Sequence, residues 1–376
     1  MIYLDYAAST PVDEEVLNEF IKVTKENYAN PNSNHELGHQ ALNKINEATS
    51  KIASLLHVDS DEIIYASGAT ESNNLAIRGT ALRYKNRGKH ILVSSLEHNS
   101  IISSCTALQE NGFEIELIPV TKEGTIDISC LKQMIRPDTI LVSVCSVDSE
   151  LGLVQPIEQI GELLKQYENI VFHTDASQSI GKVTIDYRNC DLITIAPHKF
   201  YGLNGVSILV KKHNVSLSPL ILGGKSTTIY RSGTPSTNLI AATAVALEKA
   251  ITSLDKRNAI IKKYYNQIIT NLKEYSKVTI NNTEKSIPSI INMSLSGIKS
   301  DLIVSLFNER HIMISSKTSC CPLNSPSKLV YALTKNKNLA TTSIRISLSH
   351  LTTQKEVDEF LKQFAQIYKE VAYGKL

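Results

Sequence analysis

An aspartate and a lysine stand 24 residues apart in a stretch whose residue types suit carbonyl chemistry. Asp175 follows the apolar run 169–174, and Lys199 follows a second apolar run at 191–196. A lysine amine can hold an aldehyde as a Schiff base, and a carboxylate can keep a pyridine nitrogen protonated so that the ring accepts electrons. The pair therefore predicts a pyridoxal phosphate site. For these two residues alone, a structural aspartate and a surface lysine remain an equally good interpretation.

Two further segments help to decide between a cofactor site and a purely structural aspartate and lysine. The small-residue turn 67–71, with Ala69 and Thr70, lies between a predicted strand at 62–65 and a helical segment at 72–84. Its backbone N–H groups and the Thr70 hydroxyl can bind a phosphate, although turns of this kind cap many helices. His98 follows the strand 90–94, at the end of the sheet where α/β proteins bind ligands. An imidazole there can stack on a ring, although a lone histidine is more often a hydrogen-bonded structural residue.

The elements that must position these groups alternate between short β-rich runs and helical patterns. This alternation predicts a mostly parallel sheet. Its seven expected strands are 62–65, 90–94, 114–120, 139–144, 169–174, 191–196 and 205–210.

After the sheet the pattern becomes mixed. Long helices are expected at 236–254 and 256–275, and the second of them can bridge two lobes. Beyond them we expect strands at 277–280, 290–295 and 312–315, helices at 299–309 and 354–371, and a helix and strand near 343–348. The fold class is therefore α/β, with a large domain of residues 15–255 and a smaller α+β domain formed by 1–14 and 256–376.

Composition places the chain among ordinary enzymes with two lobes. Its 376 residues are 42% hydrophobic and 20% charged, with a net charge of +2 that is spread along the chain. We therefore expect no nucleic-acid partner. The N-terminus has no signal pattern and no apolar run is long enough to span a bilayer, so we expect a cytoplasmic protein without a membrane partner.

Six cysteines occur without a Cys-x-x-Cys spacing, so neither a zinc site nor any other metal site is expected. Cys105, Cys145 and Cys190 lie in apolar or helical surroundings and are expected to be core thiols. The adjacent Cys320 and Cys321 differ, because they stand in a segment rich in serine and proline.

Taken together, the motifs resemble the cysteine desulfurases of the class V aminotransferase family, which are pyridoxal phosphate enzymes of fold type I. The resemblance extends over nearly the whole chain, and jointly its motifs are highly specific. They are residues 3–11 (YLDYAASTP), 67–72 (SGATES), 97–98 (EH), 175–179 (DASQS), 198–199 (HK), 231–234 (RSGT) and 343–347 (SIRIS).

The resemblance implies a role for each matched residue. Lys199 would be the Schiff-base lysine, Asp175 the partner of the ring nitrogen, Gln178 the partner of the ring hydroxyl and His98 the stacking group. Ala69, Thr70 and His198 would hold the phosphate. Thr234 would reach the phosphate site of a neighbouring subunit, which implies a homodimer with shared active sites. Arg345 would bind the substrate carboxylate through its planar fork.

The family's sulfur acceptor is a cysteine on a mobile loop, which the resemblance places at Cys320. The substrate would be L-cysteine, Lys199 would move its α-proton, and the Cys320 thiolate would attack the sulfur to leave a persulfide and L-alanine. A partner protein would then take the sulfur for iron–sulfur clusters, tRNA thiolation or another product. Cys321 can relay the persulfide, protect it or be neutral.

Several positions depart from the family pattern. Asp148 and Ser149 stand where the family has two asparagines, Ala196 replaces a phosphate-binding serine, and Pro197 and Lys317 replace glycines. An acidic Asp148 can alter the pKa of the imine. The missing serine hydroxyl at position 196 predicts weaker phosphate binding, but no group that the chemistry strictly needs is lost.

Two other interpretations stay open. The chain can be a class V enzyme with different chemistry, such as an aminotransferase, a selenocysteine lyase or a C–S lyase that works without Cys320. It can also be a degenerate homologue that acts as a partner protein, which the changes at 149, 196 and 197 favour. Retention of Lys199, Asp175, Gln178, His98 and Arg345 together argues against the second.

Overall fold

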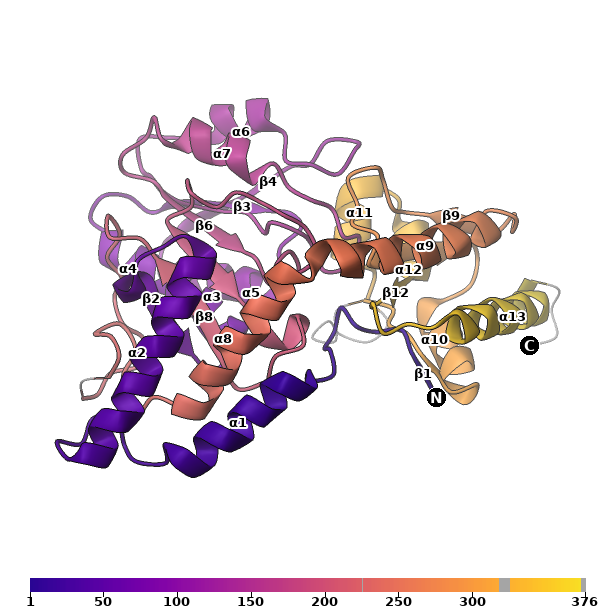
Figure 1. Ribbon diagram of the computed structural model, residues 1–376. Helices are drawn as coiled ribbons and strands as arrows, with labels where there is room; N and C mark the ends of the chain where they lie inside the picture. The colour runs from indigo at the N-terminus through magenta and orange to yellow at the C-terminus, as the bar shows by residue number, and fades with distance from the viewer. Residues whose placement is uncertain (225, 318–324, 373–376) are drawn as a thin grey trace.

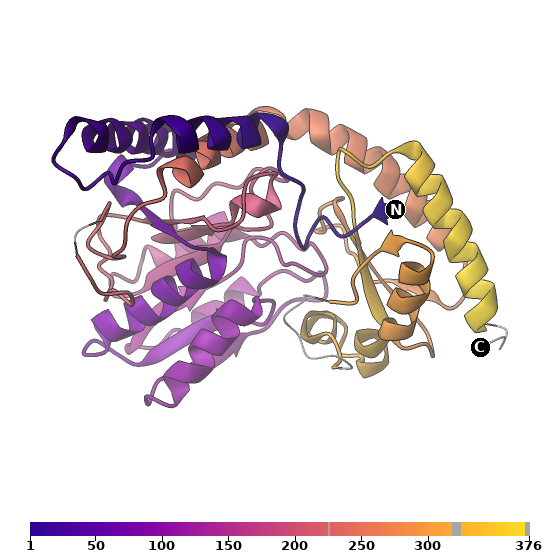
Figure 2. The same cartoon turned by 90° about the horizontal axis from the view of Figure 1, so that it is seen from below.

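The computed structural model describes residues 1–224, 226–317 and 325–372, so Cys320 and Cys321 lie outside the described residues. The chain forms a larger and a smaller lobe side by side (Figure 1). The view from below shows the long helices along one side of both lobes (Figure 2). Among the described residues, no helix combines the length and apolar character that crossing a bilayer requires.

The larger lobe is built on the seven-stranded sheet that the sequence predicts. Strand β8 is antiparallel to both of its neighbours, and the other pairs are parallel. Every residue of the strands other than β4 is buried, which explains why these runs are almost continuously apolar. The spatial order is β2 (Ile63–Ala66), β8 (Ser207–Lys211), β7 (Leu192–Ile195), β6 (Val171–Asp175), β5 (Thr139–Ser143), β3 (His90–Ser94), β4 (Glu114–Ile118).

Helices cover both faces of this sheet, and successive strand residues pack against opposite layers. Leu92 packs in one core and Ile91 and Val93 in the other. The first core includes α1 (Glu14–Glu26), α2 (Glu36–Leu56), α6 (Ile128–Met134), α7 (Ile157–Leu164) and α8 (Thr237–Thr252). The second includes α5 (Asn99–Gln109) and the continuous helical run α3 (Ala69–Asn74), η2 (Leu75–Gly79), α4 (Thr80–Tyr84). The sequence analysis did not place α1 or α2.

The smaller lobe has a core of its own around Phe307, Phe360 and Phe364. Its sheet has the order β12 (Ser343–Ser347), β10 (Ile290–Leu295), β9 (Val278–Ile280), and its helices include α9 (Leu254–Leu272), α10 (Ser300–Glu309), α11 (Lys328–Thr334), α12 (Lys337–Thr342) and α13 (Gln354–Ala372). The N-terminal strand β1 (Ile2–Tyr3) pairs with β11 (Ile312–Met313). Leu4 belongs to this core, which joins the two ends of the chain in one lobe. The division at residues 15 and 255 stays a prediction.

Candidate active site

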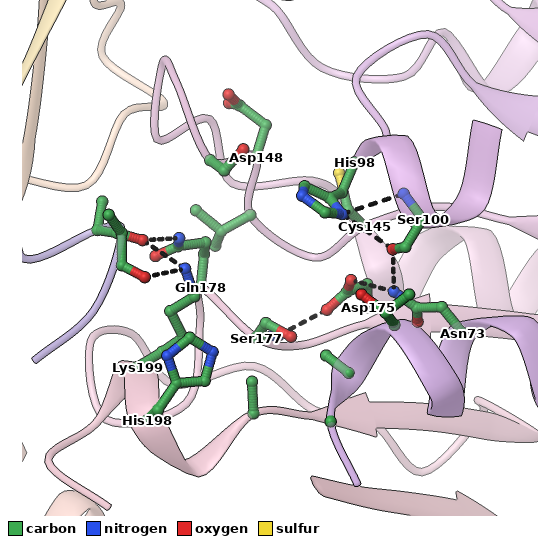
Figure 3. Close-up of a pocket in the computed structure, with 18 of the residues that line it drawn as sticks. Asn73, His98, Ser100, Cys145, Asp148, Asp175, Ser177, Gln178, His198 and Lys199 are labelled. Atoms are coloured by element: carbon green, nitrogen blue, oxygen red, sulfur yellow. Dashed lines mark hydrogen bonds between the residues drawn. The ribbon is translucent and has the colours of Figure 1, made fainter. Parts of the chain in front are cut away.

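One cavity of about 320 Å³ lies at the carboxyl ends of four adjacent strands, β3, β5, β6 and β7. The loop or turn after each strand supplies side chains to it, as α/β folds generally do. Figure 3 shows how these side chains converge. The lining includes Ala69, Thr70, His98, Asp175, Gln178, His198, Lys199 and Arg345, which the sequence analysis singled out. The structure therefore brings these residues together, while their individual roles stay predictions.

Lys199 enters the cavity from a short turn after β7, the 3₁₀ segment η3 (Pro197–Lys199). Its Nζ donates to the backbone carbonyl of Ala7 at 2.7 Å and of Ala8 at 2.8 Å. The N-terminal segment also bonds His198, whose carbonyl accepts from the Thr10 amide and hydroxyl, each at 3.0 Å. Ala7 and Ala8 thus line the cavity beside the lysine, although they are far from it in sequence.

Asp175, at the end of β6, is a buried carboxylate that lines the cavity. Its Oδ2 accepts from Asn73 Nδ2 at 2.8 Å and its Oδ1 accepts from the Ser177 amide at 2.9 Å. Each oxygen keeps lone-pair capacity, because a carboxylate has about four acceptor sites. The carboxylate is thus fixed in place and can still accept from a ligand nitrogen.

His98 precedes α5 and caps it. Its Nδ1 accepts from the Ser100 amide at 3.2 Å and lies 2.9 Å from the Ser100 hydroxyl. Burial lowers the pKa of His98, with Asp175 opposing this and Lys199 adding to it. The contacts with Ser100 hold the His98 ring in the wall of the cavity, where an imidazole can stack on a bound ring.

The donor set fits pyridoxal phosphate. Thr70 and the backbone of 67–70 border the cavity, and an added side chain at Gly68 would meet nothing within 4 Å, so this end is open. The Ser177 hydroxyl, which also lines the cavity, is buried without a hydrogen-bond partner among the described residues. A buried donor of this kind suits a bound oxyanion, because leaving it unsatisfied is costly.

The turn 67–71 is itself held by an ion pair. Glu71 Oε2 accepts from the Ser67 amide at 2.9 Å and hydroxyl at 2.5 Å, and its Oε1 accepts from Arg231 Nε at 2.9 Å. Hydrogen bonds from Arg231 and Ser67 lower the pKa of Glu71 against the opposing effect of burial, the largest single influence. The motif 231–234 therefore supports the turn within the same chain.

Arg345, on β12, reaches the cavity from the smaller lobe. It is 1% exposed, and it donates to Asp5 Oδ1 and to the Ser149 carbonyl, both at 2.7 Å. Its Nε has no hydrogen-bond partner among the described residues. Because a guanidinium has five N–H donors, capacity remains for a substrate carboxylate.

Asp148, which departs from the family pattern, is engaged by the backbone of its own turn, and its effect on the pKa of the imine stays a prediction. Its Oδ1 accepts from the amides of Glu150 and Leu151 at 2.8 and 2.7 Å, and its Oδ2 accepts from the amide of Leu153 at 2.7 Å. Burial raises its pKa to about 6. The carboxyl group therefore mainly shapes the turn 148–153, although it also borders the cavity.

Three contacts hold the described residues on either side of the stretch 318–324. Ser315 and Arg345 exchange backbone hydrogen bonds at 3.1 and 2.6 Å. Lys317 Nζ donates to the Ser325 carbonyl at 2.7 Å. The Ser327 hydroxyl, which caps α11, donates to Glu150 Oε2 at 2.5 Å. Cys320, the expected nucleophile, belongs to the stretch between them and lies outside the described residues.

Thr234 does not border this cavity. It lines a second one with Ser67, Gly205 and Arg231. Ser67 and Gly205 also line the first cavity, so the two cavities share a wall at the turn 67–71. The role of Thr234 toward a neighbouring subunit stays a prediction.

Comparison with known proteins shows which family has this arrangement of residues. Residues 2–360 match the model of the family "Aminotransferase class-V". The cysteine desulfurase IscS of Pseudoalteromonas translucida is 38% identical over 367 residues, covering 95% of this chain and 90% of the relative. That of Dictyoglomus turgidum is 35% identical over 375 residues, covering 98% and 95%.

The chain belongs to the class V aminotransferases, among the cysteine desulfurases. A solved structure of a NifS-like protein has a TM-score of 0.92 and 30% identity, and the match covers 98% of this chain and 99% of that one. The family depends on pyridoxal phosphate, so the predicted cofactor and fold type I are confirmed.

Sequence reasoning missed several members of the site. Asn73, Ser100 and Ser177 surround Asp175, and Lys182 bonds the side chain of Gln178. Lys182 stands four residues after Gln178, a spacing that could have indicated contact. Asn73 and Asp175 are 102 residues apart, and no local pattern joins them.

Proposed function

We propose that the residues around this cavity carry out cysteine desulfuration, in which L-cysteine gives L-alanine and its sulfur passes to Cys320. The observation that carries the assignment is the convergence of the Lys199 amine, the Asp175 carboxylate and the His98 imidazole on one cavity whose rim holds the buried Arg345. An amine, a carboxylate and a carboxylate-binding arginine in one cavity suit an amino-acid substrate.

Each side chain has a task that its position supports. Bound pyridoxal phosphate supplies an electron sink that weakens bonds at the α- and β-carbons of the substrate. Asp175 would pair with its ring nitrogen, and Ser177 and Thr70 would donate to its phosphate. Lys199 Nζ would move the α-proton of the substrate. Arg345 would hold the substrate carboxylate.

In the sulfur step, the Cys320 thiolate attacks the substrate sulfur. An S–S bond forms and the C–S bond breaks, and the electron pair stays on carbon, which is protonated. The products are a persulfide on Cys320 and L-alanine, so L-cysteine plus an enzyme thiol balances the equation. Two contacts of the described residues that flank 318–324 support this role, because Ser315 pairs with the backbone of Arg345 and Lys317 donates to the Ser325 carbonyl.

A homodimer is part of the proposal. The segment 219–235 holds Leu222 and Ile229, which are 80% and 79% exposed. Two strongly exposed apolar side chains in one segment favour a protein contact. Thr234 belongs to the same segment and lines a cavity next to the turn 67–71, so a second subunit docking here would approach the phosphate end of the site. Light scattering on the purified protein should give twice the chain mass.

A protein acceptor then takes the persulfide sulfur, with iron–sulfur cluster assembly and tRNA thiolation as the pathways we propose for a cytoplasmic enzyme. A second thiol, Cys321, stands beside Cys320. A Cys321→Ala variant that forms the persulfide at the normal rate but passes it on slowly would assign Cys321 to transfer.

The test combines the visible spectrum of the purified protein, before and after L-cysteine, with measurement of alanine and sulfide. Wild type should bind the cofactor and form both products, and Cys320→Ala should bind it and form neither at a comparable rate. Cys130→Ala, which changes a half-buried cysteine on α6, serves as the control and should behave as wild type. A Cys320→Ala variant as active as wild type would assign the chain to another class V reaction. A colourless wild-type protein would revive the partner-protein interpretation.

A further inference from the structure

Gln178 is held on two sides by groups that dictate which way its amide points. Its side chain is buried, with the residue 4% exposed, and it lines the cavity beside Lys199. Its Nε2 donates to the Ala7 carbonyl at 2.8 Å. Its Oε1 accepts a short hydrogen bond from Lys182 Nζ. The two ends of one amide therefore have partners of opposite kind.

Lys182 is behind Gln178 and not in the cavity itself. It lines a small neighbouring cavity, whose wall is shared with the first at Ala7 and Lys199. Its backbone is fixed as well, because the Lys182 amide donates to the Ser179 carbonyl and its own carbonyl accepts from Asn258 Nδ2 on α9, both at 2.9 Å. A substituent on the cofactor ring would meet Gln178 and not Lys182.

Reversing the amide would put like groups together on both sides. The Gln178 nitrogen would face Lys182 Nζ, which is the donor in the observed contact, and its oxygen would face the Ala7 carbonyl, which has only acceptors. Both hydrogen bonds would be lost, and two buried polar groups would be left facing groups of their own kind. In the observed orientation, Nε2 carries one hydrogen to Ala7 and keeps the other for the cavity.

We propose that Lys182 is a positioning residue that fixes Gln178 as a hydrogen-bond donor toward the ring oxygen of the bound cofactor. The inference rests on the proposed function only in taking pyridoxal phosphate as the occupant of the cavity. The Ala7 carbonyl also connects Gln178 to Lys199, since it accepts from both Lys199 Nζ and Gln178 Nε2. Lys182 thereby supports both groups without touching the ligand.

The environment of Lys182 favours a tight contact with a neutral acceptor. Burial lowers the pKa of Lys182 well below its ordinary value, and the neighbouring charges of Lys199 and Arg345 lower it further. The Gln178 oxygen accepts from the buried Lys182 Nζ without adding a charge near Lys199.

A double-mutant cycle on the apoprotein tests the proposal, read out as the dissociation constant of pyridoxal phosphate and the visible absorption band of the complex. Lys182→Met keeps the length of the side chain and removes the donor. We expect it and Gln178→Ala each to weaken cofactor binding about tenfold and to shift the absorption band. If Lys182 acts through Gln178, the double variant should again be only about tenfold weaker, whereas independent effects would multiply to about a hundredfold.

Two further variants guard against a purely structural effect. Lys182→Arg retains a donor and should restore binding to within about threefold of wild type. Lys85→Met changes an exposed lysine at the end of α4 and should change neither readout. If Lys182→Met does not fold, Lys182→Gln replaces it in the cycle, because an amide can donate or accept and no longer dictates the orientation.

The outcomes separate this inference from the proposed function. Multiplicative effects, or a Lys182→Met variant with the affinity and spectrum of wild type, would overturn the positioning role. Failure of the wild-type protein to bind pyridoxal phosphate at all would instead overturn the proposed function.

Discussion

Replacing Arg345 with lysine should weaken the use of L-cysteine far more than it weakens the fold. The substitution keeps the positive charge and removes the planar fork that can hold a carboxylate through two parallel hydrogen bonds. Two of the five guanidinium donors serve Asp5 and Ser149 in the structure. The remaining donors are the ones that we assign to the substrate.

The magnitude follows from the number of hydrogen bonds lost. One charge-assisted hydrogen bond contributes about 2 kcal/mol, and 1.4 kcal/mol corresponds to a factor of about 10. Losing one bond to the substrate therefore predicts a fall of about 30-fold in kcat/KM for L-cysteine. Most of the change should be in KM, because the carboxylate is bound both before and during the reaction.

The assay is the initial rate of alanine formation over a range of L-cysteine concentrations, with urea unfolding in parallel. Arg310→Lys is the matched control, because Arg310 forms a two-point pair with Glu370 at 2.8 and 2.7 Å elsewhere in the smaller lobe. It should leave kcat/KM unchanged. A folded Arg345→Lys enzyme with kcat/KM within about twofold of wild type would refute the assignment of Arg345 to the substrate carboxylate.

Three other predictions concern the turn 148–153, the cap of α11 and the catalytic lysine. Burial raises the pKa of Asp148 from 3.8 to about 6, so its contribution to stability is full below pH 3.8 and is lost as the pH rises through 6. When the pH is raised from about 5 to about 8, the unfolding free energy of wild type should therefore fall by about 1.4 kcal/mol more than that of Asp148→Asn. Urea unfolding that gives equal falls for the two proteins would contradict this. Ser327→Ala removes the cap of α11 and one hydrogen bond to Glu150 Oε2, which should cost about 2 kcal/mol of unfolding free energy. Thr341→Ala, at a half-buried threonine of α12 that caps no helix, should cost less than about 0.5 kcal/mol, and equal costs would argue against the cap. Lys199→Ala should bind the cofactor without a covalent link, and a cofactor still fixed to the protein by borohydride reduction would exclude Lys199 as its attachment site.

The sheet and much of the site could be predicted because their signals are local. The seven strands are short apolar runs whose residues are mostly buried on both faces, and a buried strand needs no knowledge of its neighbours to be recognised. Asp175 and Lys199 follow two such runs, and carboxyl ends of adjacent parallel strands meet at one edge. The sequence thus determined the sheet, the edge at which the cavity lies and the chemical type of the two main groups that line it.

The contacts that orient those groups are decided by tertiary structure. Lys199 bonds carbonyls 192 and 191 residues away, and Arg345 bonds Asp5 across 340 residues. Asp148 differs in chemical type from what the family pattern leads one to expect, yet its oxygens are engaged by backbone amides of its own turn. Residue type and spacing determine which groups reach the edge of the sheet, whereas the partner of each lone pair and N–H depends on how distant segments pack, and no local pattern encodes that packing.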